Sequence, residues 1–149
     1  MSSSKQELIP FKVERERRFL VSEVGERPIR FTTIEQGYLT SPGDAPVRIR
    51  IENGKTAIQN MKIGKLYLER EVSIPMNVAH TIMENFCEVP QIGRHVLHKF
   101  RYRIGKDDRF ELDIYTGRLT GLVIMEIELH EDEGWHDELE FPEEVRVMR

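Results

Sequence analysis

The sequence lacks the features that mark several classes of protein. Its 149 residues contain one cysteine, Cys87, so an internal disulfide is excluded and a buried, inert thiol is expected. No apolar run approaches membrane-spanning length, and the polar start of the chain has no signal-peptide core. The basic excess of a general nucleic-acid binder is also missing, because the net charge is −4. These absences favour a cytoplasmic protein without nucleic-acid or membrane partners.

The chain combines an ordinary apolar content with a large share of charge. Apolar residues make up 39% of the sequence and charged residues 32%. A chain of this length can bury a real core, so residues 1–149 are expected to form one domain. Residues 1–10 are interpreted as a peripheral lead-in and residues 131–149 as a peripheral, acidic and irregular tail. Trp135 in that tail is interpreted as a small cover in preference to a residue that stacks on the substrate.

Turn signals divide most of the chain into short segments that favour β-strands. A turn is predicted at 41–44, and Asn53-Gly54 predicts a tight hairpin. Apolar residues at helical spacing predict one helix over 76–87, which Pro90 stops. The predicted strands are 12–21, 33–39, 47–51, 56–63, 66–74, 95–104, 110–115 and 122–130.

Eight short strands joined in sequence favour an antiparallel meander, and closure into a barrel would remove its exposed edges. The expected fold is mainly β (α+β): an eight-stranded antiparallel closed β-barrel, or tunnel, with one or few flanking helices. Eight strands enclose an interior that side chains can fill or that holds one small ligand. Apolar strand faces left exposed would be compatible with a homodimer.

Seven of these strands carry ionic residues at alternating positions, which places them on one face of each strand. The bases are Arg18, Arg48, Arg50, Lys62, Lys99, Arg101 and Arg103. The acids are Glu14, Glu16, Glu69, Glu71, Glu111, Asp113, Glu126 and Glu128. A solvated outer face explains any one strand, with cross-strand pairs of about 0.2–1 kcal/mol each. Solvation does not, however, require paired bases or paired acids in so many strands.

The alternative is a barrel whose charged faces line a wet central tunnel. Clustered arginine and lysine suit several phosphates at once, because they donate charge-assisted hydrogen bonds. Clustered carboxylates suit hard divalent cations such as Mg²⁺ or Mn²⁺. Walls of both kinds would hold a polyphosphate together with its metal ions.

The charged residues form a series of motifs with a characteristic order. They are Glu14-x-Glu16-x-Arg18, Arg48-x-Arg50, Lys62, Glu69-x-Glu71, Lys99-x-Arg101-Tyr102-Arg103, Glu111-x-Asp113 and Glu126-x-Glu128. This series resembles the CYTH, or triphosphate tunnel metalloenzyme, superfamily, whose members share an N-terminal Glu-x-Glu-x-Lys signature and an eight-stranded antiparallel tunnel. The resemblance runs from Val13 to His130. Residues 36–39 and 121–129 also resemble the short bacterial members.

The resemblance implies divalent-metal-dependent hydrolysis of a linear triphosphate, with inorganic tripolyphosphate preferred. The residues that would bind phosphate oxygens are Arg18, Arg48, Arg50, Lys62, Lys99, Arg101 and Arg103. Those that would hold the bridging Mg²⁺ or Mn²⁺ are Glu14, Glu16, Glu126 and Glu128. Those that would support a second metal or orient the attacking water are Glu69, Glu71, Glu111 and Asp113.

Three departures from the family pattern keep other functions open. Arg18 replaces the signature lysine, Ser73 stands where members often have a third glutamate, and the tail is short. A non-catalytic module that binds polyphosphate or a nucleoside triphosphate would keep the basic walls and lose the water-activating carboxylates, which are present here. Thiamine triphosphatase and class IV adenylyl cyclase-type activity are further alternatives. A cyclase would need a base pocket that the sequence does not identify.

Overall fold

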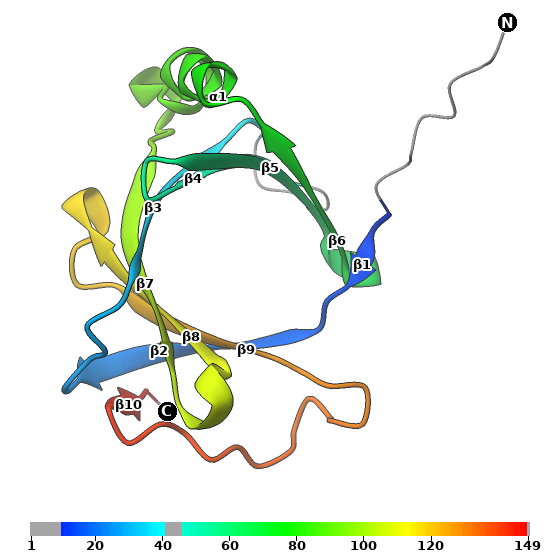
Figure 1. Ribbon diagram of the computed structural model, residues 1–149, viewed down its shortest axis with the longest axis vertical. Helices are drawn as coiled ribbons and strands as arrows, with labels where there is room; N and C mark the ends of the chain where they lie inside the picture. Colours follow the sequence, from blue (N-terminus) through cyan, green and yellow to red (C-terminus); the bar gives the residue numbers. More distant parts are fainter. Residues whose placement is uncertain (1–9, 41–45, 149) are drawn as a thin grey trace, which may run out of the picture.

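The computed structural model describes residues 10–40 and 46–148, and their strands form one antiparallel sheet. The order in the sheet is β1-β6-β5-β4-β3-β7-β8-β9-β2-β10. Strands β2 to β9 curve around a common axis (Figure 1). The strands are β1 (Lys12–Val13), β2 (Glu16–Val24), β3 (Thr32–Tyr38), β4 (Val47–Glu52), β5 (Thr56–Ile63), β6 (Leu68–Ile74), β7 (Leu97–Ile104), β8 (Phe110–Thr116), β9 (Val123–Glu128) and β10 (Val145–Val147).

The predicted mainly β fold with antiparallel neighbours is confirmed, but the described strands number ten instead of eight. The first predicted strand is split at Glu14 and Arg15, where the chain leaves one partner strand for another. Glu14 N donates to Tyr67 O beside β6 (2.7 Å), whereas Arg15 O accepts from Leu129 N beyond β9 (2.6 Å). The tenth strand, β10, pairs with β2 and comes from the tail that was expected to be irregular.

Closure of the sheet into a barrel is not confirmed. Among the strands of residues 10–40 and 46–148, β1 and β10 are the terminal ones, so the ladder that these strands form does not close into a ring. Even so, β1 and β2 are consecutive in the chain and lie toward opposite ends of the sheet order. Only Glu14 and Arg15 separate them. The chain itself therefore connects the two sides of the curved sheet.

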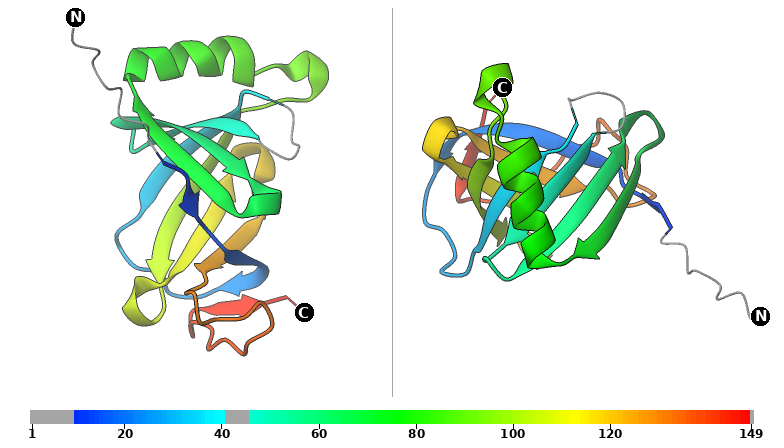
Figure 2. Two further views of the ribbon diagram at one scale, coloured as in Figure 1. Left: turned by 90° about the vertical axis from the view of Figure 1, so that its right-hand side faces the viewer. Right: turned by 90° about the horizontal axis from the view of Figure 1, so that it is seen from above.

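One α-helix, α1 (Met76–Ile82), continues into a π-helical turn, η2 (Met83–Cys87), which confirms the helix predicted over 76–87. It packs on the outside of β4 and β5 (Figure 2). Gly37 of β3 permits η2 to approach β3 closely, because a Cβ at position 37 would lie 2.5 Å from Cys87 Cβ. Cys87 is fully buried, as expected, and burial raises the pKa of its thiol. No helix of the described chain is long and apolar enough to cross a membrane.

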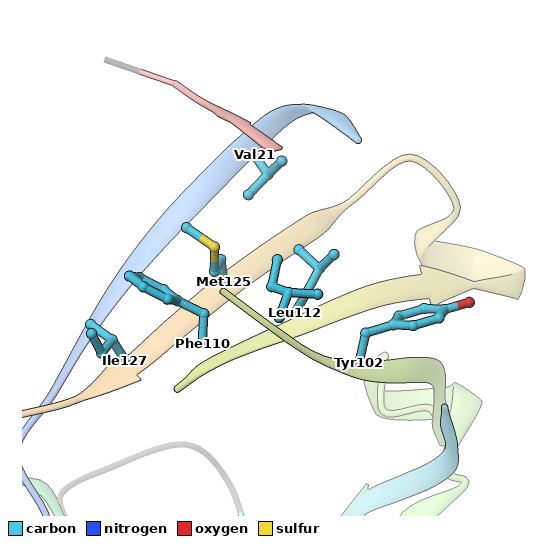
Figure 3. Close-up of a cluster of buried hydrophobic side chains, with 7 residues drawn as sticks. Val21, Tyr102, Phe110, Leu112, Met125 and Ile127 are labelled. Atoms are coloured by element: carbon cyan, nitrogen blue, oxygen red, sulfur yellow. The ribbon is translucent and has the colours of Figure 1, made fainter. Parts of the chain in front are cut away.

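The apolar core lies on the strand faces that alternate with the charged positions. Figure 3 shows its main cluster, which is formed by Val21, Tyr102, Ile104, Phe110, Leu112, Met125 and Ile127. The tail covers this cluster, since Leu139 packs against it and the rings of Phe141 and Phe19 meet edge to face at 5.0 Å. A second cluster joins α1 to Ile49 and Ile51 of β4. The other face of each strand is left for the charged residues.

Three remaining predictions concern the ends and turns of the chain. Of the lead-in predicted over 1–10, residues 1–9 lie outside the described residues, as does the turn predicted at 41–44. The Asn53-Gly54 hairpin is confirmed, because both residues have positive φ, 52° and 63°, between β4 and β5. This turn sets the register that pairs Arg50 with Ile58 and Arg48 with Asn60.

Candidate active site

The charged strand faces surround a cavity of about 460 Å³, which we call the charged cavity. Every residue predicted for the site lines it except Asp113. The predicted bases that line it are Arg18, Arg48, Arg50, Lys62, Lys99, Arg101 and Arg103. The predicted acids that line it are Glu14, Glu16, Glu69, Glu71, Glu111, Glu126 and Glu128.

Sequence reasoning missed six residues that also line this cavity: Thr32, Gln36, Tyr38, Glu52, Arg109 and Tyr115. Strand alternation could have found Glu52, which has the parity of Arg48 and Arg50, and Tyr115, which has that of Glu111. Burial raises the pKa of Tyr115 to about 12, so its phenol stays protonated and can donate a hydrogen bond.

On the wall formed by β4, β5 and β6, bases and acids hold one another in place. Arg50 is only 8% exposed, and its Nη2 donates to Glu71 Oε1 at 2.9 Å. Its Nε lies 3.0 Å from Glu52 Oε1 but lacks the alignment of a hydrogen bond. The guanidinium is thus desolvated between two carboxylates, where its interactions are stronger than in water.

Asn60 of β5 links the bases to the acids of this wall. Its Oδ1 accepts from Arg48 Nε at 2.9 Å, and its Nδ2 donates to Glu69 Oε1 at 2.5 Å and to Glu71 Oε1 at 3.3 Å. The side chain is fully buried. A neutral amide can accept from a base and donate to an acid at once, so Asn60 fixes both groups without adding charge.

Asp113 lies behind the cavity wall and not on its surface. Its oxygens accept from Arg101 Nε and Nη2 at 2.8 and 3.0 Å, and Lys99 Nζ lies 2.8 Å away. Burial acts to raise the pKa of Asp113, but the hydrogen bonds and charges of Arg101 and Lys99 outweigh it and lower the pKa. The carboxylate therefore holds two cavity bases in position.

On the wall formed by β2 and β9, two carboxyls lie close together. Arg18 pairs with Glu126 and Glu16 pairs with Glu128 in register. Burial raises the pKa of Glu126, and the neighbouring charge of Glu16 and a hydrogen bond between the two carboxyls raise it further. Opposed carboxyls of this kind are oxygen donors that a divalent cation would draw together.

The described residues contain no cluster of three or more histidine, cysteine or acidic side chains already arranged as a metal centre. The donor chemistry nevertheless fits Mg²⁺ or Mn²⁺, because Glu16 and Glu126 both line the cavity, contact the same arginine and present hard oxygen ligands. Arg18 lies between them, with its Nε 2.8 Å from Glu126 and its Nη2 3.7 Å from Glu16. Its guanidinium is one positive charge that a bound cation would have to displace or accompany.

Lys62 of β5 reaches across the gap between β6 and β2. Its ammonium lies 3.1 Å from Glu16 and 3.7 Å from Glu14. These ion pairs join the two sides of the curved sheet at the place where the ladder of the described strands is open. Lys62 therefore links the side chains of β5 to those on and beside β2.

The tail is attached to the rim of the cavity through Arg109 and Glu133. Two guanidinium nitrogens of Arg109 pair with the Glu133 carboxylate, and Arg109 Nη2 also donates to Glu128 O at 3.0 Å. The hydrogen bond from Arg109, followed by that from the backbone of His130, lowers the pKa of Glu133 to about 2.

This depressed pKa predicts a specific pH dependence. A carboxylate with a folded pKa of about 2 and an unfolded value of about 4.3 contributes its stabilisation fully above that unfolded value. The contribution is lost as the pH falls toward 2. We expect the Glu133 carboxyl carbon to titrate with a midpoint of about 2 in an NMR experiment. A midpoint at the unfolded value would show that the Arg109 pair is not formed in solution.

Comparison with known proteins gives two clear relatives. An inorganic triphosphatase of Acetivibrio thermocellus is 33% identical over 123 residues, which cover 80% of this chain and 76% of the relative. The chain belongs to the inorganic triphosphatase branch of the CYTH superfamily. The inorganic triphosphatase of Nitrosomonas europaea is 32% identical over 123 residues, which cover 80% of this chain and 78% of that protein.

Solved structures agree with this CYTH assignment. The crystal structure of the inorganic triphosphatase NE1496 has a TM-score of 0.54 at 29% identity and covers 80% of this chain and 75% of that one. A second crystal structure, of the hypothetical protein NE1496, has a TM-score of 0.55 at 28% identity, with coverage of 80% and 78%. No family model matches the chain.

Two of the residues that depart from the CYTH motifs, Arg18 and Ser73, can be located in the structure. Arg18 takes the place of the signature lysine and pairs with Glu126, while its side chain remains 58% exposed. Ser73 pairs with Ile58 across the ladder and does not line the charged cavity. A glutamate at position 73 would continue the acidic row of Glu69 and Glu71 on β6, level with Arg50 across the sheet.

Proposed function

We propose that this CYTH protein hydrolyses a linear triphosphate, with inorganic tripolyphosphate as the preferred substrate, in the charged cavity. The observation that carries the proposal is that bases and acids from seven strands line a single cavity. The two relatives named inorganic triphosphatase, each matched over 80% of this chain, support it. Phosphoryl transfer requires mainly positioning and charge neutralisation, which such a cavity supplies.

The bases would bind the phosphate oxygens in place of some of the acids and amides that they contact in this structure. Arg50 and Lys62 are paired with acids that line the cavity. Arg48 is paired with the buried amide of Asn60, and Lys99 and Arg101 are paired with Asp113 behind the wall. Anionic phosphates would replace some of these contacts, and Arg18 and Arg103 would add charge from more exposed positions. Lys99 and Arg50 are the most buried of these bases, so we expect their phosphate contacts to be the strongest.

The carboxylates would divide into two groups. Glu14, Glu16, Glu126 and Glu128 would hold Mg²⁺ or Mn²⁺. When bound, such an ion neutralises phosphate charge and activates water. Glu69, Glu71 and Glu111 would support a second ion or orient the attacking water. Asp113 would act with them by holding Arg101 and Lys99, because its oxygens already accept from those bases.

We further propose that the curved sheet works as a closed tunnel. The continuity of β1 with β2 and the ion pairs of Lys62 with Glu14 and Glu16 support this, because they bridge the gap in the strand ladder. The partner of the site is then a small-molecule triphosphate. A cytoplasmic location and a homodimer stay predictions of the sequence.

The decisive assay is phosphate release from tripolyphosphate, ATP and thiamine triphosphate, each with Mg²⁺, with Mn²⁺ and with EDTA. We expect release from tripolyphosphate that EDTA abolishes and that Glu16→Gln greatly reduces, because this change removes one charged metal ligand. Tight metal-dependent binding of tripolyphosphate without release would instead identify a binding module. Release that survives EDTA would contradict the proposed role of the metal.

A further inference from the structure

Gln36 of β3 is the most buried residue that lines the charged cavity, with only 3% of its surface exposed. Its Oε1 is fully buried and has no hydrogen-bond partner among the described residues. Its Nε2 has no partner among them either. A buried amide oxygen without a partner costs free energy, because it has given up its hydrogen bonds to water. Such a group in a cavity wall therefore requires an explanation.

The residue directly opposite Gln36 on β4 is Arg50. Its Nε is also buried without a hydrogen-bond partner among the described residues. An unpaired acceptor and an unpaired donor thus lie on opposed residues of adjacent strands, where Cβ atoms are about 4.5–5.5 Å apart. They do not meet in this structure, because Arg50 Nη2 donates to Glu71 of β6 at 2.9 Å and so holds the guanidinium toward that strand.

Asn60 shows what such an amide does when both of its ends are paired. It lies opposite Arg48 in the register of β4 and β5, just as Gln36 lies opposite Arg50 in the register of β3 and β4. The oxygen of Asn60 accepts from Arg48 Nε, and its nitrogen donates to two carboxylates of β6. Asn60 therefore has a base and anions as partners, and the same two roles are available to Gln36.

The charges around Gln36 indicate which anion its nitrogen would bind. The two most buried bases of the cavity are its neighbours: Arg50 lies directly opposite, and Lys99 pairs with Ile34, two positions along β3. A phosphate bound to these bases would come within reach of the Gln36 amide. A neutral N–H donor adds a contact to that phosphate without adding to the repulsion among the bases.

We propose that Gln36 is a substrate-binding residue: its Nε2 donates to a phosphate oxygen of the bound triphosphate while its Oε1 accepts from Arg50 Nε. The phosphate replaces Glu71 as the partner of Arg50 Nη2, which allows the guanidinium to turn toward β3. Gln36 then holds Arg50 in the position that contacts the phosphate. This inference rests on the proposed function, because it requires the triphosphate to lie in the charged cavity.

Calorimetric binding of the bis-methylene analogue of tripolyphosphate, with Mg²⁺, tests this contact without hydrolysis. Gln36→Met keeps the length of the side chain and removes both hydrogen-bonding groups. We expect it to weaken binding by about 10- to 100-fold, the range for loss of a hydrogen bond to a charged group. Gln36→Glu keeps an acceptor for Arg50 but replaces the amide donor by an oxygen that repels phosphate, so it should weaken binding at least as much.

Gln59→Met is the matched control. Gln59 lies on β5 next to Asn60, and therefore on the opposite face of the strand, and it does not line the charged cavity. Its replacement removes the same chemical groups and should leave the dissociation constant of the analogue unchanged.

The melting temperature of the ligand-free protein separates a binding role from a structural one. Gln36→Met removes a buried acceptor that has no partner, so the melting temperature should stay at the wild-type value or rise although binding is weaker. A lower melting temperature would identify Gln36 as a structural residue and overturn the inference.

A double-mutant cycle with Arg50→Ala tests the pairing of the two side chains. In the double variant, the loss of affinity for the analogue should be at least about threefold smaller than the product of the two single losses, because the side chains act as a pair in the complex. Their effects on the free energy of unfolding without ligand should add, because the pair is not formed there.

The outcomes also separate this inference from the proposed function. Equal binding of the analogue by Gln36→Met and the wild type, or losses of affinity that multiply in the double variant, would overturn the inference even if the wild type hydrolyses tripolyphosphate. A wild type that neither binds the analogue nor hydrolyses tripolyphosphate would contradict the proposed function and, with it, this inference.

Discussion

Replacing Arg50 by alanine is expected to lower kcat/KM for tripolyphosphate by about 10²- to 10³-fold, the range found when one preorganised donor is removed from an active site. The reason is the desolvated position of its guanidinium between Glu52 and Glu71. Without it, two carboxylates would face the phosphates with no base between them. Steady-state phosphate release at several substrate concentrations gives the value.

Arg70→Ala is the matched control for this substitution. Arg70 is on β6, between Glu69 and Glu71, and therefore on the opposite face of the strand. Its guanidinium lies 5.0 Å from the centre of the Phe11 ring and does not line the charged cavity. We expect nearly wild-type kinetics from this variant. Equal losses in both variants would show that arginine content, and not the position in the cavity, decides activity.

Replacing Asp113 by alanine is expected to destabilise the fold by about 3–5 kcal/mol, because breaking a buried ion pair leaves its partners uncompensated. Here two cations, Lys99 and Arg101, would lose the carboxylate that neutralises them while they remain largely buried. For a domain of this size the melting temperature should fall by roughly 6–20 °C. Urea unfolding followed by circular dichroism would measure the free-energy change.

An exposed ion pair provides the comparison. Glu23 and Arg146 lie 3.7 Å apart between β2 and β10, with side chains 68% and 75% exposed. Glu23→Ala should therefore change the free energy of unfolding by less than about 1 kcal/mol. A loss of less than about 1 kcal/mol in the free energy of unfolding of Asp113→Ala would contradict the prediction. It would mean that water reaches Lys99 and Arg101 in the variant and solvates them.

Alternation along single strands predicted most of the charged cavity, because the side-chain period of a strand is 2 whatever its partners are. Asp113 shows where this reasoning ends. It has the same parity as Glu111, but in the register of β7 and β8 it lies opposite Arg101. Its carboxylate is enclosed by Arg101 and Lys99 and not exposed to the cavity. The parity of Asp113 cannot show whether its carboxylate is exposed to the cavity, because that exposure depends on which residues pair across the strands.

Contacts between distant segments could not be predicted from the sequence either. The sequence carried no sign that Trp135 would meet Tyr67. Tyr67 was assigned to the predicted strand 66–74, although β6 begins at Leu68, and Trp135 was assigned to an irregular tail. The split of the first strand also depends on its neighbours, because β1 pairs with β6 whereas β2 pairs with β9. In both cases the pairing of distant segments determines the structure, and local residue patterns do not indicate which segments pair.

The pairing of β2 with β9 has a consequence for how the protein is made. Arg18 and its partner Glu126 are 108 positions apart in the chain. At about 5–20 residues per second, a ribosome would need roughly 5–22 s to synthesise the intervening segment. During this time β2 has emerged but has no neighbouring strand. Its charged residues, Arg17 and Arg18 among them, would help to keep the waiting segment from pairing with other nascent chains.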